Sequence, residues 1–204
     1  MRKMCGMLVF CFLVVTFFWC GMLFGDRKLL NEELIRLHVV ANSDSDEDQA
    51  VKLQVRDAVM ASLESAMADV TDVDQAKAYL RENLPKIRMV ANEVLTRAGF
   101  EPDAVVTLCR ETFDTRVYDT FTLPAGVYES LRIVIGEGEG RNWWCVVFPT
   151  LCIPAAGEGF EDVTAGAGFP DALSNTLTGE AGYEIRFFLL DALGRLENIF
   201  FLEE

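Results

Sequence analysis

The chain has 204 residues, enough for one domain with appendages, and its 51% hydrophobic and 25% charged residues are typical of a folded protein. It carries 18 Lys and Arg against 32 Asp and Glu, a formal net charge of −14. Such an acidic surface repels phosphate groups, which excludes nucleic acid as the main partner and disfavours electrostatic binding to anionic lipid headgroups.

Residues 1–25 predict a membrane-spanning or signal helix. Beyond Arg2 and Lys3 this segment has no charged residue, and a helix of that length spans about 30 Å of hydrocarbon. The positive-inside rule then keeps the N-terminus in the cytoplasm and sends the remainder outside the cytoplasmic membrane. Bulky residues before Cys20 suit neither signal-peptide cleavage nor lipid attachment, so both a cleaved signal and an uncleaved anchor remain open.

Residues 34–41 predict a strand in which apolar residues alternate with Arg36 and His38, which fall on its polar face. A run of helix-capping residues from Asn42 to Asp48 follows, and apolar residues at helical spacing then predict a long helix to about Met67.

The middle of the chain predicts two more helices, Asp74–Asn83 and Pro85–Ala98, because proline suits a first helical turn. Apolar and β-branched runs then predict four strands, Ala104–Phe113, Tyr118–Leu123, Leu131–Ile135 and Trp144–Phe148.

Residues 155–182 are rich in glycine, lack periodicity and predict a long mobile loop. The tail, residues 183–204, favours a helix that is apolar nearly all round, so it is either buried or docked on something outside the domain. The predicted fold is a mixed α and β (α/β) single domain at residues 26–154, with helices packed on a mixed sheet of four to five strands.

The segment from Gly136 to Cys152 alternates glycine with acidic residues and then places Trp143 and Trp144 in a short apolar strand. Alternating glycines let a backbone turn or approach another surface, and adjacent tryptophans are costly to leave in water. Two interpretations remain open for the tryptophans, a tight turn that enters a core strand and a functional surface.

Three cysteines lie beyond the N-terminal segment, which permits three different single disulfides. Cys145 and Cys152 are the natural pair, because Pro149 turns the chain between them; an extended segment would hold them roughly 23 Å apart. Two buried free thiols are the alternative.

The sequence gives little indication of a catalytic or metal-binding site. A Ser-His-Asp or Cys-His arrangement must use His38, the one histidine, and no spacing selects Ser43, Ser45, Cys109 or Cys145 as its nucleophile. A zinc site needs about three spaced ligands, which are not evident.

The acidic run before the long helix copies the opening of a calcium loop, but Gln49 and Val55 occupy the positions that need Gly and Glu. Helix capping is the interpretation. We therefore predict no catalytic residue, no metal and no cofactor.

Two blocks of sequence carry a family resemblance. Residues 37–59, which include Leu37-His38-Val39-Val40-Ala41-Asn42-Ser43-Asp44-Ser45, closely resemble the N-terminal signature of stage II sporulation protein R. Residues 136–152, with Asn142-Trp143-Trp144-Cys145, resemble its second signature, although Arg141 and Thr150 depart from it. We call these blocks the first and second signatures.

The resemblance implies a signalling protein that is made in the forespore and exported into the space between the two cell membranes. There such proteins activate a membrane-embedded aspartic protease of the mother cell, which cleaves the precursor of sigma-E. An activator needs only to bind one state of its receptor better than the other. We expect the signatures to supply the partner-binding residues: His38, Asn42, Ser43, Asp44, Asp48, Asn142, Trp143 and Trp144.

Two other functions remain open. An extracytoplasmic hydrolase that acts on cell wall or peptide would place His38 or a carboxylate in a cleft beside the tryptophans. A scaffold tethered to the membrane by its N-terminal helix would lose its activity when released from residues 1–25.

Overall fold

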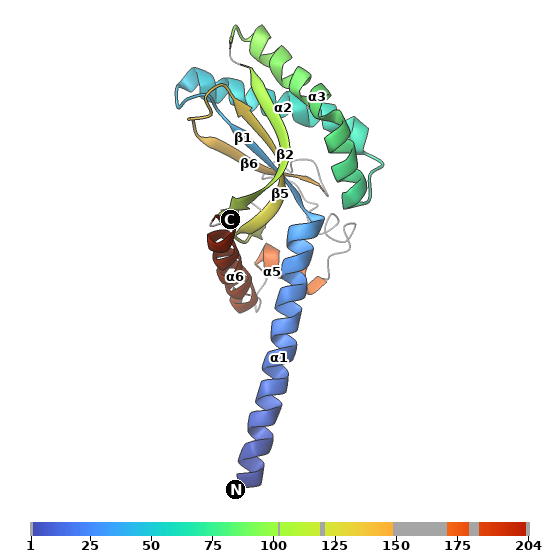
Figure 1. Cartoon of the computed structure of the whole chain (residues 1–204), viewed down its shortest axis with the longest axis vertical. Helices are drawn as coiled ribbons and strands as arrows, with labels where there is room; N and C mark the ends of the chain where they lie inside the picture. The colour runs from blue at the N-terminus through green and yellow to red at the C-terminus, as the bar shows by residue number, and fades with distance from the viewer. Residues whose placement is uncertain (1, 102, 119–120, 149–170, 180–183, 203–204) are drawn as a thin grey trace.

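The computed structural model describes residues 2–101, 103–118, 121–148, 171–179 and 184–202. Within them, a four-stranded mixed sheet has the spatial order β2 (Ala104–Phe113), β5 (Gly126–Ile135), β1 (Ile35–Val40) and β6 (Asn142–Phe148). β1 is parallel to β5 and antiparallel to β6, and β2 is antiparallel to β5. Helices cover both faces of the sheet (Figure 1), which confirms the predicted mixed α and β fold.

The N-terminal helix α1 (Arg2–Glu33) runs without interruption from an apolar stretch into the domain. Its first part is long and apolar enough to cross a membrane, and most of its large side chains are exposed. Its last turns are packed, with Leu30 fully buried and Asp26 and Arg27 only 5% and 7% exposed. The helix therefore continues past residue 25, where the sequence analysis ended it, because residues 26–33 bury against the folded domain.

Strand β1 is buried along its whole length. Its alternation is as predicted, but Arg36 and His38 are 0% and 5% exposed, so the prediction that they lie on a polar face is wrong. The cause is the cover on that side of the sheet, where α1 and α6 (Glu184–Leu202) pack on β5. Alternation within one strand reports its own polarity and not which distant helices cover it.

Helices α2 and α3 cover the other side of the sheet. α2 (Asp46–Met67) begins at the cap residue Ser45 and ends where predicted. α3 (Val73–Arg97) continues through Pro85, so the prediction of two separate helices is wrong. The buried residues of α3 stay on one face before and after the proline, and their packing on α2 and β2 offsets the hydrogen bond that proline removes.

The predicted strands at 104–113, 131–135 and 144–148 are confirmed, and β5 begins earlier than expected, at Gly126. The predicted strand Tyr118–Leu123 is reduced to a two-stranded ribbon of β3 (Arg116–Val117) and β4 (Thr122–Leu123).

The C-terminal region contains two helices. α5 (Asp171–Thr178) lies where the sequence analysis predicted a loop, so that prediction is wrong for residues 171–178. The buried side chains of Leu173 and Leu177 anchor this helix. Residues 155–170 and 180–182 lie outside the described residues. The predicted C-terminal helix is confirmed as α6.

The sheet separates two hydrophobic cores. The first core fills the space between the sheet and α2 and α3, and includes Leu37, Val55 and Leu80. The second core lies on the opposite face, where Leu30 and Leu190 from α1 and α6 meet residues of β2, β5 and β6.

Candidate functional site

The two signatures meet at one corner of the sheet, where β1 ends and the turn between β5 and β6 begins. The amide of Gly140 donates to the carbonyl of Ala41 over 3.0 Å, and the amide of Glu139 donates to the carbonyl of Asn42 over 3.1 Å. The side chain of Asn42 accepts another hydrogen bond, of 3.1 Å, from the amide of Glu137, 95 residues away in sequence. The loop after β1 therefore supports the glycine turn through hydrogen bonds to its backbone.

Close approach of the two backbones explains the glycines of the turn. A Cβ atom on Gly140 would lie 2.2 Å from the carbonyl oxygen of Ser43, far inside van der Waals contact. Gly138 has φ of +67°, a conformation that other residues rarely adopt, and a Cβ there would lie 2.6 Å from the side chain of Val134. The interpretation that these glycines permit a turn and a close approach is confirmed.

Asp48 is the centre of the polar contacts beneath this corner. Its Oδ2 atom accepts hydrogen bonds from Asn42 Nδ2 at 2.9 Å and Ser43 Oγ at 2.5 Å, and its own amide donates to Ser45 Oγ at 3.1 Å. The hydrogen bond from Ser43, followed by that from Asn42, lowers the pKa of Asp48 despite its burial. The run before α2 is thus a capping structure with an ionised carboxylate inside it.

A second set of contacts fixes the far side of the turn. The amide of Arg141 donates to Asp44 Oδ1 at 2.7 Å, and the carbonyl of Arg141 accepts from Lys52 Nζ at 2.9 Å. Lys52 also donates to Gln49 Oε1 at 2.6 Å. Burial, and then the positive charge of Arg141, lowers the pKa of Lys52. Lys52 and Gln49 were not predicted as site residues, although both belong to the first signature.

Burial divides the predicted partner-binding residues. Asp44 and Asn142 are exposed, whereas Asn42, Ser43 and both tryptophans are half-buried and His38 and Asp48 are buried. The structure therefore brings the polar residues together at one corner, and the aromatic residues beside it are shared between the two faces of the sheet.

His38 and Trp144 form a stacked pair in the second core. They are cross-strand neighbours on β1 and β6, with ring centroids 3.8 Å apart. His38 Nδ1 lies 3.0 Å from Glu111 Oε2, and the ring of Phe113 packs edge-on against Trp144. Burial opposes ionisation of Glu111, but the hydrogen bond to His38 and other favourable interactions outweigh it and lower the pKa of Glu111.

Arg36 is the largest fully buried side chain and was not predicted as a site residue. Its guanidinium lies 3.9 Å from the ring centroid of Phe113 and 5.1 Å from that of Tyr128, and it donates a 2.9 Å hydrogen bond to Tyr118 Oη. Cation–π contacts are strongest where both partners are desolvated. The sequence offered one signal for Arg36: it alternates with apolar residues on the same face of β1 as His38.

Trp143 packs on the opposite face from Trp144, because successive residues of a strand point to opposite sides. It lies against the first core, with the guanidinium of Arg56 from α2 4.1 Å from its ring centroid. Among the described residues no hydrogen-bond acceptor reaches its buried indole nitrogen. The adjacent tryptophans thus anchor β6 to both cores, so core packing explains much of their presence.

Cys145 belongs to a disulfide in the structure, whereas Cys11, Cys20 and Cys109 are free. Cys152 lies outside the described residues. The pairing of Cys145 with Cys152 therefore stays a prediction.

The described residues show no assembled catalytic arrangement around His38, whose hydrogen bonds there go to Glu111. Ser43 donates to the carboxylate of Asp48, and Ser45 caps α2. Burial raises the pKa of the Cys109 thiol, which disfavours the reactive thiolate. No group of three or more His, Cys, Asp or Glu among these residues is placed to hold a metal ion.

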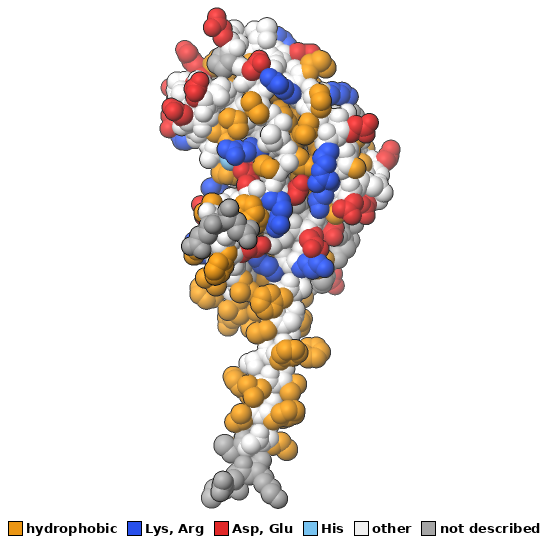
Figure 2. All heavy atoms as spheres, viewed as in Figure 1, with side chains coloured by type: hydrophobic (Ala, Val, Ile, Leu, Met, Phe, Trp, Pro, Cys, Tyr) orange, Lys and Arg blue, Asp and Glu red, His pale blue; other side chains and the backbone are white. Residues whose placement is uncertain are grey.

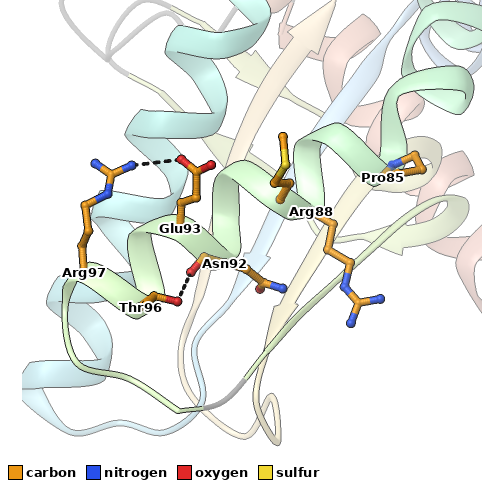
Figure 3. A pocket seen from close by; sticks show the side chains of 7 residues that line it. Pro85, Arg88, Asn92, Glu93, Thr96 and Arg97 are labelled. Atoms are coloured by element: carbon orange, nitrogen blue, oxygen red, sulfur yellow. Dashed lines mark hydrogen bonds and ion pairs between the residues drawn. The ribbon is translucent and has the colours of Figure 1, made fainter.

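A separate hollow of about 610 Å³ lies on the outer side of α3 (Figure 3). It is lined by Pro85, Arg88, Met89, Asn92, Glu93, Thr96 and Arg97. Arg97 pairs with Glu93 at 3.2 Å. All of these residues come from α3, and none belongs to either signature.

The comparisons with known proteins concern the part of the chain that holds this corner. The family model of stage II sporulation protein R matches residues 31–157, which include both signatures. The chain belongs to the stage II sporulation protein R family. It is 34% identical over 187 residues to stage II sporulation protein R of Bacillus subtilis (strain 168). The alignment covers 82% of this chain and 83% of that relative. No solved structure matches the chain.

The stage II sporulation protein R match covers β1 to β6 and the helices between them. Most of α1 and all of α5 and α6 lie outside the matched residues. The family match therefore covers the sheet and its corner, whereas the second core is completed by elements outside the matched residues.

Proposed function

We propose that the chain is an extracytoplasmic signalling protein of endospore formation, which activates a membrane-embedded aspartic protease that processes the sigma-E precursor. The observation that carries this proposal is the meeting of both family signatures in one corner of the sheet. Two segments 95 residues apart there build one hydrogen-bonded surface. A preformed surface suits an activator, because it can favour one state of the receptor with a smaller loss of entropy on binding.

The course of α1 supports a location outside the cytoplasm. Arg2 and Lys3 precede the apolar part of the helix, and the positive-inside rule places them in the cytoplasm. The folded domain then lies on the outer side, in the space between forespore and mother cell, either anchored by α1 or released from it.

We assign the receptor contact to the exposed tip of the corner, which consists of Asp44, Glu137, Glu139, Arg141 and Asn142. All five side chains are exposed. The contacts beneath the tip hold it in one conformation, which reduces the entropy lost on binding. In this arrangement the buried members of the signatures support the tip from inside, and the tryptophans fix the strand that leads out of it.

The test is a reconstitution in vegetative cells that lack other sporulation proteins. The receptor protease and the sigma-E precursor are co-expressed with this chain, and precursor cleavage is followed by immunoblot. We expect cleavage that depends on export of the chain. Absence of cleavage with an exported, folded chain and its cognate receptor would overturn the proposal.

The contact surface is tested with charge reversals at the tip, Glu137→Arg and Glu139→Arg. Within the described part of the chain, the side chains of both residues form no hydrogen bond or ion pair, and only their backbone amides bond the loop after β1. Glu64→Arg is the matched control, because Glu64 is exposed near the far end of α2. We expect the tip variants to reduce cleavage and the control to retain it; equal cleavage in all three would place the contact elsewhere.

The rival function, a hydrolase that acts on cell wall or peptide, would use the pair of His38 and Glu111 beside Trp144. His38→Gln separates the two functions. A hydrolase that uses His38 as general base would lose about 10² to 10⁴ in rate. An activator with the same substitution should retain precursor cleavage, provided that its thermal unfolding shows a folded chain.

A further inference from the structure

Helix α6 exposes a long apolar stripe that the domain does not cover. The exposed large side chains are Ile185, Phe188, Leu196, Ile199, Phe200 and Leu202, each between 52% and 74% exposed. They recur at helical spacing on one side of α6. The opposite side is fixed against the sheet by Leu190, which is fully buried, and by Gly194, where a Cβ would lie 1.7 Å from the carbonyl oxygen of Ala125. The orientation of the stripe is therefore set by the fold.

Polar contacts join α6 to α1 at the level where the apolar part of α1 ends. Arg186 Nη2 lies 2.6 Å from Asp26 Oδ2, and Arg27 Nη2 lies 2.6 Å from Glu197 Oε2. Asn31 also donates to Glu197, over 3.0 Å. These contacts use about 16 Å of α6 but only about 8 Å of α1, at 1.5 Å per residue. α6 therefore crosses α1 at the end of the apolar segment.

The exposed stripe is continuous with the apolar surface of α1. An apolar groove of about 390 Å³ joins the two helices. It is lined by Val15, Thr16, Trp19, Cys20, Leu23, Phe24, Leu189 and Leu193. Figure 2 shows the apolar side chains gathered at the foot of the domain, around the point where α1 leaves it.

The uninterrupted helix makes this geometry rigid. α1 passes from its apolar segment into the second core without a linker, so the domain cannot swing away from the axis of α1. A bilayer that surrounds residues 6–25 must then meet the foot of the domain, where α6 lies.

We propose that the exposed face of α6 lies in the interfacial layer of the bilayer that α1 crosses. The occupant of the stripe and of the groove is lipid, and apolar side chains make the contact. We expect this contact to need no anionic lipid, because the acidic chain repels anionic headgroups. The domain is thereby held upright on the membrane with one fixed side toward the lipid. This inference is independent of which protein the chain activates.

The test uses the full chain reconstituted in vesicles of phosphatidylcholine that contain a clickable phospholipid. The photoreactive residue p-benzoylphenylalanine replaces Phe188, Leu196 or Phe200 in separate variants, and Met89 in the control. Met89 is 55% exposed on α3, away from the foot of the domain. Irradiation is followed by detection of lipid attached to the protein, at low salt and at high salt.

We expect lipid attachment at the α6 positions to exceed that at Met89 several-fold and to persist at high salt and without anionic lipid. Attachment to a second copy of the chain in place of lipid, or lipid attachment no greater than at Met89, would overturn the proposal. Three separate α6 positions keep the test decisive if one variant fails to fold, as judged by its thermal unfolding.

Discussion

Replacement of Asp48 by alanine should destabilise the domain more than any other single change in the first turn of α2. The carboxylate is 7% exposed and accepts hydrogen bonds from Asn42 and Ser43. Asp48→Ala leaves both donors beneath the glycine turn without their acceptor. The substitution also removes a negative charge from the positive end of the helix dipole.

The magnitude follows from these contacts. A hydrogen bond to a charged group contributes about 1.5–3 kcal/mol, and a carboxylate in the first helical turn contributes about 0.3–1 kcal/mol. Both donors share the Oδ2 atom, so their contributions are not additive. We therefore expect Asp48→Ala to lower the free energy of unfolding by about 2–4 kcal/mol. The exposed neighbour Glu47, changed to alanine, should lower it by about 0.5 kcal/mol or less.

The assay is urea denaturation of the full chain in nonionic detergent, followed by tryptophan fluorescence. The fluorescence of Trp143 and Trp144 reports on unfolding of the domain, because Trp143 packs against the first core and Trp144 against the second. Asp48→Asn adds a pH test. Since the folded pKa of Asp48 is lowered, its contribution is complete above the ordinary carboxyl pKa and is lost as pH falls through the folded value.

The stability difference between the parent and Asp48→Asn should therefore be largest near neutral pH and shrink below about pH 4. Equal losses for Asp48→Ala and Glu47→Ala, or a difference that does not change with pH, would refute this reasoning.

Three further changes test other contacts by the same denaturation assay. Gly140→Ala should lower the free energy of unfolding by about 1–3 kcal/mol, because its Cβ would meet a carbonyl of the β1 loop; no loss would mean that the turn can relax. Glu111→Gln should cost about 1–3 kcal/mol at neutral pH, because it weakens the hydrogen bond to His38. This cost should shrink as pH falls below 4.5, the ordinary pKa of a glutamate, since the pKa of Glu111 is lowered in the folded chain. A cost independent of pH would contradict the view that ionised Glu111 stabilises the fold through His38. Arg27→Ala should cost about 1.5–3 kcal/mol, because it removes the charged partner of Glu197 at the joint of two helices and leaves that carboxylate with the hydrogen bond from Asn31; if Glu197→Gln restores none of that loss in the double variant, the ion pair is not its source.

Much of the first core could be predicted from the sequence. The alternation of β1 and the helical spacing in α2 identify their buried faces, because each pattern records contacts with a single neighbouring layer. The glycines from Gly136 to Gly140 similarly indicate a close approach, since no other residue tolerates it. What they approach was not predictable, because the partner backbone, that of Ala41 to Ser43, comes from a distant part of the chain.

The second core escaped prediction for a physical reason. Arg36 and His38 look like residues of an exposed face, and their burial depends on α1 and α6 at the two ends of the chain. Local pattern also misplaced a boundary at Pro85, where packing on both sides outweighs one missing hydrogen bond. The structure brings the polar residues of the first signature together at one corner, and their role in binding a partner stays a prediction. Sequence alone does not distinguish a side chain that faces a partner from one that supports the loop beneath it.

Because α1 is continuous with the folded domain, we expect any proteolytic cut near residue 25 to occur before the domain folds. Leu23, Asp26 and Arg27 are buried in the folded chain, and the peptide bonds around them are helical. A peptidase that cuts there needs this helix to open locally, which breaks the contacts with α6. An unfolded nascent chain would lack this protection, so in the exported protein proposed above removal of α1 would compete with folding. We expect a pulse–chase experiment to show release of the domain only in the first moments after translocation, after which every uncut molecule keeps its anchor; steady cleavage of folded molecules would exclude this order.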